Sequence, residues 1–172
     1  MKRLYLLRHG QTEFNVKKLV QGRCDSPLTS LGRQQAQAAA AWLKANGVVP
    51  DKVISSPLGR AMDTASLVAC ELLGPDAAAE PCEGIIERCY GSFEEGPHDA
   101  LPTDVWDPGE DLVPFGGEGS RALQERMVDT LTNLMGSEGI ETLLAVTPRQ
   151  RQPPIIKAAA PEGFELPAKL PN

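Results

Sequence analysis

The chain has 172 residues, which suits one domain that can bury a core without disulfide bonds. Its formal net charge of −6 argues against a nucleic-acid-binding surface, although it leaves room for a local basic pocket that holds an anion. Four cysteines without a CxxC pair and only two histidines predict no metal site.

Nothing in the sequence indicates a membrane protein or an exported protein. The apolar run in MKRLYLLRHG is too short for a signal peptide, and no stretch approaches the length of a membrane span. We therefore expect a cytoplasmic protein with reduced thiols.

Short apolar runs alternate with longer runs of helical character along the chain. Four short runs predict strands, at residues 3–9, 51–56, 79–82 and 142–146. The first of them has little polar relief, so we expect a central strand that is buried on both faces. Three longer runs predict helices, at residues 27–47, 57–74 and 120–136.

The ends of the predicted helices carry suitable capping residues. Thr29 or Ser30 can cap the start of the first helix, and Gly47 stands where a glycine often ends one. The second helix is expected to begin near Pro57 and to end at Gly74. The third has an apolar face, made of Leu123, Met127, Leu131 and Leu134.

This order of elements predicts an α/β fold, a three-layer α/β/α sandwich with a mostly parallel central sheet, in a single domain over residues 1–172. Ligands of such sheets bind beyond the carboxyl ends of the strands, where polar residues follow three of the predicted strands. Residues 89–119 are rich in glycine, proline and acidic residues. We expect them to form a long insertion that covers the active site.

The end of the first strand carries residues suited to phosphate chemistry. Arg8 offers a planar fork of donors for phosphate oxygens, His9 can be a neutral nucleophile near pH 7, and Gly10 lets the backbone approach a ligand. A structural histidine beside a salt-bridged arginine would show the same pattern. These three residues alone leave both interpretations open.

Five blocks in order carry a family resemblance. RHGQTEFN resembles the Arg-His-Gly-x-Thr-x-x-Asn signature of the histidine phosphatase superfamily, also called the phosphoglycerate mutase-like family. The blocks QGRCDSPLTSLGRQQA, ISSPLGRAMDTA, IIERCYGSFEEG and FGGEGS resemble the segments that follow in that family. The resemblance covers residues 3–146.

The resemblance implies a phosphomonoester hydrolase that forms a phosphohistidine on His9. Glu87 would be the general acid that protonates the leaving oxygen and later activates water. The phosphoryl oxygens would be held by Arg8, Asn15, Arg60 and a backbone N–H of Gly22. The chemistry needs no metal and no other cofactor, and its partner would be a small phosphorylated substrate.

Two of these assignments have rivals or open questions. Glu83, Glu94 and Glu95 compete with Glu87, which the spacing to Gly91 favours. Burial would raise the pKa of the Glu87 carboxyl and nearby arginines would lower it, and the sequence does not say which effect is larger. His98, in the predicted insertion, is expected to be exposed.

The family pattern breaks after the last predicted strand, where a second histidine is expected within Ser/Thr-His-Gly. Here Thr147 is followed by Pro148 and Arg149. Deleting one base from a permitted coding of this stretch would restore Thr-His-Gly. An out-of-frame segment at residues 148–154, an inactive diverged homologue and an unrelated loop all remain open. The family usually continues past the position of Asn172, so the resemblance also suggests a truncated C-terminus.

Three functions follow, in order of preference. The first is a phosphatase, because the mutases of the family carry extra segments. The alternative is a catalytically impaired homologue with a regulatory or binding role, whose pocket would still attract phosphate or sulfate. The third is a phosphoglycerate mutase. The substrate and the oligomeric state are left open.

Overall fold

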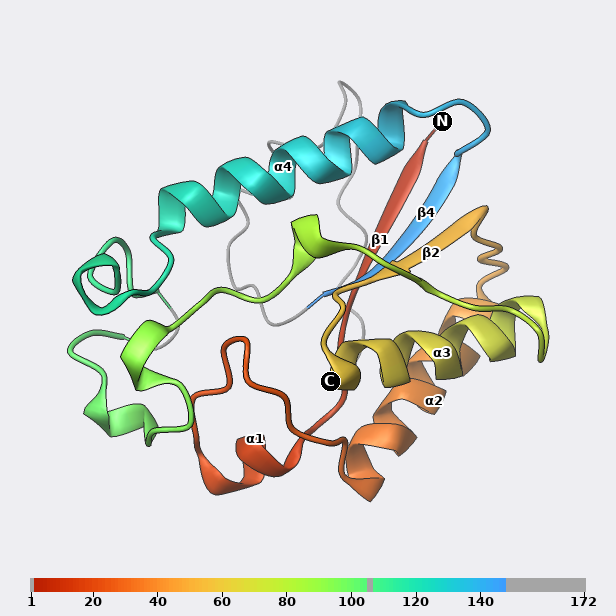
Figure 1. Cartoon of the computed structure of the whole chain (residues 1–172). Coiled ribbons are helices and arrows are strands. Elements are labelled where there is room, and N and C mark those ends of the chain that lie inside the picture. The colour runs from red at the N-terminus through yellow and green to blue at the C-terminus, as the bar shows by residue number, and fades with distance from the viewer. Residues whose placement is uncertain (1, 105–106, 148–172) are drawn as a thin grey trace.

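The computed structural model describes residues 2–104 and 107–147, and Figure 1 shows a twisted sheet at its centre. Its strands run in the order β1–β4–β2–β3, and all neighbouring pairs are parallel. Their bounds are Arg3–Arg8 for β1, Lys52–Ser55 for β2, Glu80–Pro81 for β3 and Thr142–Thr147 for β4.

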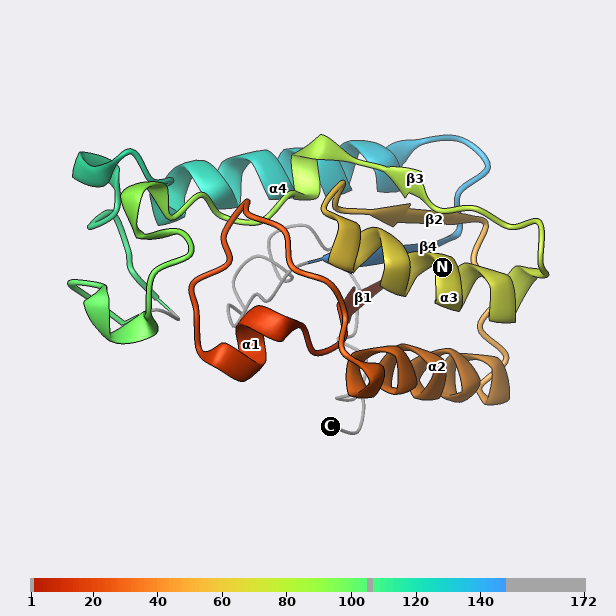
Figure 2. The same ribbon diagram turned by 60° about the horizontal axis from the view of Figure 1, so that its bottom comes forward.

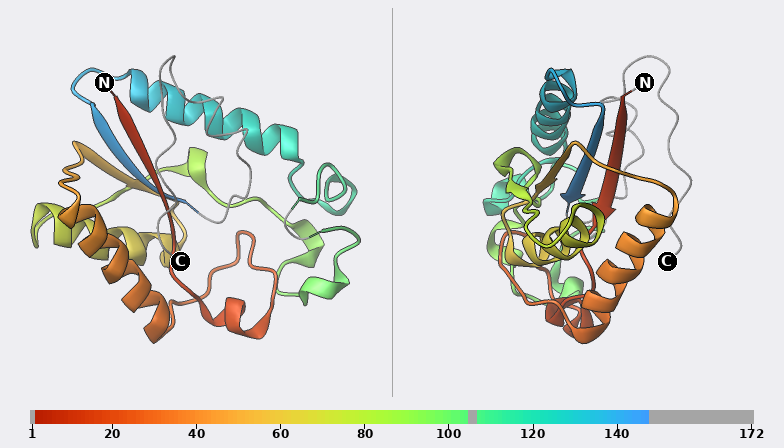
Figure 3. Two further views of the ribbon diagram at one scale, coloured as in Figure 1. Left: turned by 180° about the vertical axis from the view of Figure 1, so that it is seen from behind. Right: turned by 90° about the vertical axis from the view of Figure 1, so that its right-hand side faces the viewer.

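Helices cover both faces of this sheet. Figures 2 and 3 show α4 on one face and α2 with α3 on the other, which confirms the predicted α/β sandwich. The helices are α1 (Glu13–Lys17), α2 (Ser30–Ala45), α3 (Gly59–Leu73) and α4 (Ser120–Gly136). Short 3₁₀ turns are η1 (Glu83–Ile85), η2 (Gly91–Phe93), η3 (His98–Ala100) and η4 (Val113–Phe115).

Strand β4 joins the two apolar cores. Leu144 and Val146 pack with α2 and α3, whereas Leu143 and Ala145 pack with α4, and all four are fully buried. Alternate residues of a strand point to opposite faces, so an uninterrupted apolar run is what a strand between two layers requires.

The expectation of a central, doubly buried first strand is not met among the described residues. There β1 lies at an edge of the sheet and pairs with β4 alone. Leu4 and Leu7 are buried, but Tyr5 and Leu6 are half-buried. The two inner strands are β4 and β2, each of which has a partner strand on both sides.

The predicted helix boundaries agree with the structure to within two or three residues. The Thr29 hydroxyl accepts a hydrogen bond from Gly32 N at 3.0 Å, and Gly47 and Gly74 follow their helices with φ of +68° and +108°. The buried face of α4 differs in one residue, because Met135 and not Leu134 is buried. Steps of four residues from Leu123 reach Met135 on the same face.

Residues 89–119 fold mainly against the loop that follows α1. Leu101 and Leu112 form a small third core with Val20, and the backbone of Val20 exchanges hydrogen bonds of 2.8 Å with Glu95 and Gly96. The described part of the chain contains no helix long and apolar enough to cross a bilayer. The predictions about residues 148–154 and the C-terminus lie outside the described residues.

Two glycines let the end of β1 lie directly against the first turn of α2. A Cβ at Gly10 would collide with the carbonyl oxygen of Gly32, and a Cβ at Gly32 would collide with that of Gln11. Gln11 O also accepts a hydrogen bond from Thr29 N at 2.9 Å. This backbone contact holds the loop that follows His9.

We expect Gly32→Ala to lower the free energy of unfolding by about 1–3 kcal/mol, because the clash involves backbone that cannot rotate away. At a helix position without such a clash, replacing glycine with alanine stabilises the helix by about 1 kcal/mol. The matched control is Gly136→Ala in α4, where an added Cβ meets nothing within 4 Å. Urea unfolding measures both, and a Gly32→Ala midpoint equal to that of the unaltered chain would contradict the close-contact explanation.

Candidate active site

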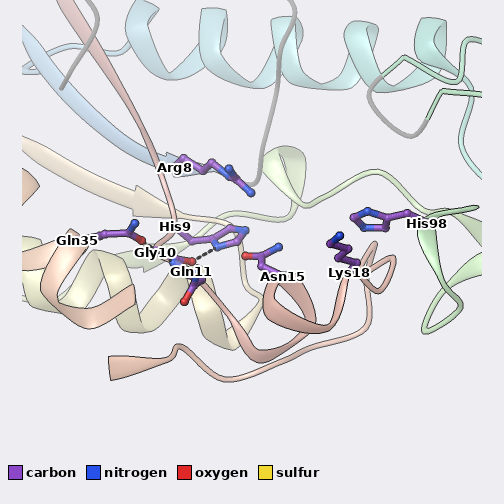
Figure 4. A pocket seen from close by; sticks show the side chains of 8 residues that line it. All are labelled: Arg8, His9, Gly10, Gln11, Asn15, Lys18, Gln35 and His98. Atoms are coloured by element: carbon purple, nitrogen blue, oxygen red, sulfur yellow. Dashed lines mark hydrogen bonds between the residues drawn. The ribbon is translucent and has the colours of Figure 1, made fainter. Parts of the chain in front are cut away.

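A polar cavity of about 450 Å³ opens at the carboxyl end of β1, as Figure 4 shows. It brings together three predicted site residues, Arg8, His9 and Asn15. The other residues that line it are Gly10, Gln11, Lys18, Gln35 and His98. None of these described lining residues is acidic, so the cavity suits an anion.

His9 is held in an uncharged state with a defined tautomer. Its Nδ1 lies 2.7 Å from its neighbour's carbonyl, Gly10 O, and because a carbonyl only accepts, Nδ1 carries the proton. Nε2 therefore keeps its lone pair. Burial, followed by the positive charge of Arg60, lowers the pKa of His9 to about 3. A neutral imidazole with an available lone pair is the form that can attack phosphorus.

Arg60 stands at the start of α3, and its side chain is fully buried. Nη2 donates to Gly22 O and Nη1 to Cys24 O, both at 2.7 Å. Its Nε has no hydrogen-bond partner in the described part of the chain. The guanidinium thus anchors the loop at residues 22–25. Arg60 does not line the cavity, although it is close enough to His9 for its charge to lower the pKa of the imidazole.

Asp25 connects that loop to α3 and was not singled out from the sequence. The residue before α3, Leu58, cannot cap it, and Asp25 does so from a distance. Its Oδ2 accepts from Gly59 N at 2.6 Å and its Oδ1 from Arg60 N at 3.3 Å. A carboxylate at a helix N-terminus is favourable, and no local sequence pattern reveals one that arrives from another segment.

Glu87 follows η1, and its carboxyl can hold a proton near neutral pH. Burial of the carboxyl raises its pKa to about 7, against the opposing charge of Arg60, an N–H donated by Arg88 and the charge of Arg8. Burial therefore outweighs the arginines, which answers the question that the sequence left open. Glu87 does not line the cavity itself, but its carboxyl lies close enough to Arg60 and Arg8 to feel both charges.

The rivals of Glu87 have other positions or partners. Glu94 accepts hydrogen bonds from the backbone N–H groups of Arg23 and Tyr90, at 3.0 and 2.9 Å. Its other carboxyl oxygen accepts from the Cys24 thiol at 3.2 Å. Glu83 and Glu95 are exposed. These surroundings favour Glu87 as the acid.

Asn15 and Gly22 have structural partners that the sequence did not predict. Asn15 Oδ1 accepts from Thr12 N at 3.1 Å, and Asn15 N donates to the Thr12 hydroxyl at 3.2 Å, which closes a capping box on α1. Gly22 has φ of +54° and offers its carbonyl to Arg60. It does not line the cavity, and its predicted backbone N–H contact stays a prediction.

His98 was expected to be exposed, but it is half-buried and lines the cavity beside Lys18 (Figure 4). His98 N donates to Lys18 O at 3.1 Å, and its Nε2 lies 3.1 Å from Leu19 O. These contacts dock η3 on the loop after α1. They join residues about eighty positions apart, so no local signal could have placed His98 here. Among the described residues, no group of three or more His, Cys, Asp or Glu side chains could hold a metal ion.

Comparison with known proteins extends the motif resemblance. The family model for the histidine phosphatase superfamily (branch 1) matches residues 4–150. A 2,3-bisphosphoglycerate-dependent phosphoglycerate mutase of Methylobacterium sp. is 35% identical over 153 residues, which cover 81% of this chain and 74% of that protein. A broad-specificity phosphatase of Saccharomyces cerevisiae is 38% identical over 92 residues, which cover 54% of this chain. The chain spans only 40% of the length of that yeast relative.

The fold is also found among solved structures. A mycobacterial glucosyl-3-phosphoglycerate phosphatase, solved with VO3, superposes with a TM-score of 0.75 at 29% identity, covering 92% of this chain and 80% of that one. The match of the family model to most of the chain, together with the relative from Methylobacterium, shows that the chain belongs to the histidine phosphatase superfamily.

Proposed function

We propose that the protein is a phosphatase that removes a phosphoryl group from a small phosphorylated substrate through a phosphohistidine on His9. The observation that carries this proposal is a buried, neutral histidine at the end of β1, close to a buried arginine whose Nε–H has no partner among residues 2–104 and 107–147. That combination offers a nucleophile and a charge-matched seat for phosphate within one site.

In the first step, Nε2 of His9 attacks phosphorus and the bond from phosphorus to the leaving oxygen breaks. Glu87 gives that oxygen its proton, and Arg8 and Arg60 balance the charge on the phosphoryl oxygens. In the second step, the Glu87 carboxylate takes a proton from water while the water oxygen attacks phosphorus. The bond to His9 then breaks and phosphate leaves.

The related proteins support a phosphatase without naming the substrate. They include a mutase, a broad-specificity phosphatase and a phosphatase of a sugar-linked phosphoglycerate. Residues 89–119 contribute His98 to the cavity, and we propose that this segment covers the site and selects the leaving group. The residue types in the cavity do not distinguish one phosphomonoester from another.

A second candidate function is a phosphate-binding homologue with slow turnover. The observation in its favour is Pro148, which stands where the family pattern has a histidine and which lacks even a backbone N–H. Losing one donor that acts on the transition state typically costs on the order of a hundred- to a thousandfold in rate. Arg8, His9 and Arg60 would still bind the anion.

Replacing the proposed nucleophile is the first test. We expect His9→Ala to lower turnover of 4-nitrophenyl phosphate by at least about a thousandfold, because no group would remain to attack phosphorus. The acid-labile phosphoenzyme trapped with a labelled substrate should vanish as well. Circular dichroism controls for folding. A folded His9→Ala protein with unchanged turnover would refute the assignment of the nucleophile.

Restoring the family motif is the second test. The double variant Pro148→His with Arg149→Gly should raise turnover by on the order of a hundredfold if a missing donor limits the chain. Arg149→Gly alone is the matched control and should have little effect. If the double variant is no faster than the unaltered chain, the missing histidine does not limit the rate.

The pH dependence tests Glu87. Its pKa of about 7 predicts that kcat/KM for an alkyl phosphate falls above pH 7, because the fraction of protonated acid falls there. His9, with a pKa of about 3, stays unprotonated from pH 5 to 9 and adds no limb. Glu87→Gln should remove the alkaline limb and lower the rate by about 10²–10⁴. The substrate loses its own second phosphate proton at about pH 6, so the profile is corrected for that ionisation. An alkaline limb that survives in Glu87→Gln after this correction would mean that another group supplies the proton.

A further inference from the structure

A bidentate ion pair links α4 to the segment before it. Arg126 Nε donates to Glu118 Oε1 at 2.6 Å, and Arg126 Nη2 donates to Glu118 Oε2 at 2.8 Å. Both side chains are largely buried, with exposed fractions of 22% and 12%. Parallel charge-assisted bonds of this kind are strong and directional, so the plane of the guanidinium is fixed.

The remaining N–H groups of this guanidinium reach the segment that carries Glu87. Arg126 Nη1 donates to Gly84 O at 3.1 Å, and Nη2 donates to Glu87 O at 3.3 Å. Arg23 adds a weaker donor to the same Glu87 carbonyl, at 3.4 Å, and its Nη2 lies 3.7 Å from Glu118 Oε2. The carbonyl of Glu87 therefore accepts from two arginines that share one carboxylate.

Glu118 also holds the far side of this segment. Its backbone N–H donates to Cys89 O at 2.8 Å, and its carbonyl accepts from Arg88 Nη1 at 3.1 Å. The chain on both sides of Glu87 is thus tied to Glu118, directly or through Arg126. This matters because residues 86–90 belong to no strand or helix that could fix them by itself.

The pair should stay ionised at neutral pH. Burial alone would raise the pKa of Glu118, but hydrogen bonds from Arg126 and the charges of Arg126 and Arg23 outweigh it and lower that pKa. Removing Arg126 would leave a buried carboxylate with little compensation and two carbonyls without this donor. The segment around Glu87 would have to move to recover solvent or new partners.

We propose that Arg126, oriented by Glu118, is a positioning residue that holds the backbone of Glu87 so that its carboxyl reaches the leaving oxygen. The inference rests on the proposed function, because it assigns Glu87 the role of acid. The Glu87 carboxyl is also hydrogen-bonded to the next backbone N–H, that of Arg88, at 2.9 Å. Its direction therefore follows the main chain that Arg126 holds. A displacement of about 1 Å at such a group can cost about a hundredfold in rate.

Comparing two substrates with different leaving groups distinguishes a loss of positioning at Glu87 from general destabilisation of the protein. A 4-nitrophenolate leaves without a proton, whereas the alkoxide of glycerol 2-phosphate needs the acid. We expect Arg126→Met to lower kcat for glycerol 2-phosphate by about tenfold or more beyond its effect on 4-nitrophenyl phosphate. Arg126→Lys should show a smaller selective loss, because lysine can pair with Glu118 but lacks the fork that reaches both carbonyls.

The same helix offers a matched control. Arg121 pairs with Glu125 on the exposed surface at 2.9 Å, with exposed side-chain fractions of 85% and 61%. Arg121→Met should leave both rates unchanged. Glu118→Gln keeps the size of the side chain and should reproduce the selective loss of activity on glycerol 2-phosphate. It replaces Arg126→Met as the test if that variant does not fold.

The variant Glu87→Gln distinguishes the proposed acid role of Glu87 from the proposed positioning role of Arg126. It should show the same selective loss, and adding Arg126→Met to it should cause no further selective loss. If Glu87→Gln is selective but the Arg126 and Glu118 variants slow both substrates equally, the positioning role is overturned. If Glu87→Gln is not selective, the acid role itself fails.

A second readout needs no turnover. The pKa of Glu87 can be followed by carbon-13 NMR of its carboxyl, assigned from the signal that Glu87→Gln removes. Loosening the segment should admit water, so Arg126→Met should move this pKa from about 7 towards the ordinary value near 4.5, whereas Arg121→Met should not. An unchanged titration in Arg126→Met would overturn the inference.

Discussion

The buried guanidinium of Arg60 is the constraint on which the site depends. It ties the loop at residues 22–25 to the start of α3 through two backbone carbonyls, and Asp25 returns from that loop to cap the same helix. Asp25 Oδ1 lies 3.4 Å from the guanidinium and has half of its side chain in solvent, so it compensates the buried charge only in part. Burying a cation costs free energy unless it is paired, and under the proposed function an incoming phosphate would supply the missing compensation.

Burial and the charge of Arg60 act together on the two groups proposed for the chemistry. Burial and Arg60 both disfavour the charged form of His9, so the imidazole is neutral. For Glu87 they oppose each other, and burial is the larger effect, so the carboxyl remains protonated up to about neutral pH. The site thus presents an imidazole with its lone pair and a carboxyl with its proton at one pH. Environments that push two titratable groups away from their ordinary pKa values are a common way to divide such roles.

The strands of the sheet position His9, and a loop held by hydrogen bonds from α4 positions Glu87. His9 sits at the end of β1, whose partner β4 is packed by α2 and α3 on one face and by α4 on the other. Glu87 has no such support from the sheet, and α4 reaches it through Arg126. The layer that covers the sheet therefore also orders the loop above its carboxyl end. The segment at residues 89–119 adds a small core of its own and brings His98 to the cavity. Variation in this segment can change what binds without disturbing the sheet.

Local patterns in the sequence were sufficient to predict the α/β layers and the helix ends at Thr29, Gly47 and Gly74. They also placed Arg8 and His9 at the end of a strand, and the motifs identified the family. Periodicity and capping depend on residues a few positions apart, so they can be read without a structure. Tertiary structure decided what depends on distant segments. It put β4 rather than β1 between two neighbours in the described sheet, and it let burial prevail at Glu87. It also brought His98 to Lys18, Asp25 to α3 and Arg126 to Glu87. The physical reason is that desolvation and long-range hydrogen bonds arise only when the chain packs, and no spacing along the sequence encodes them.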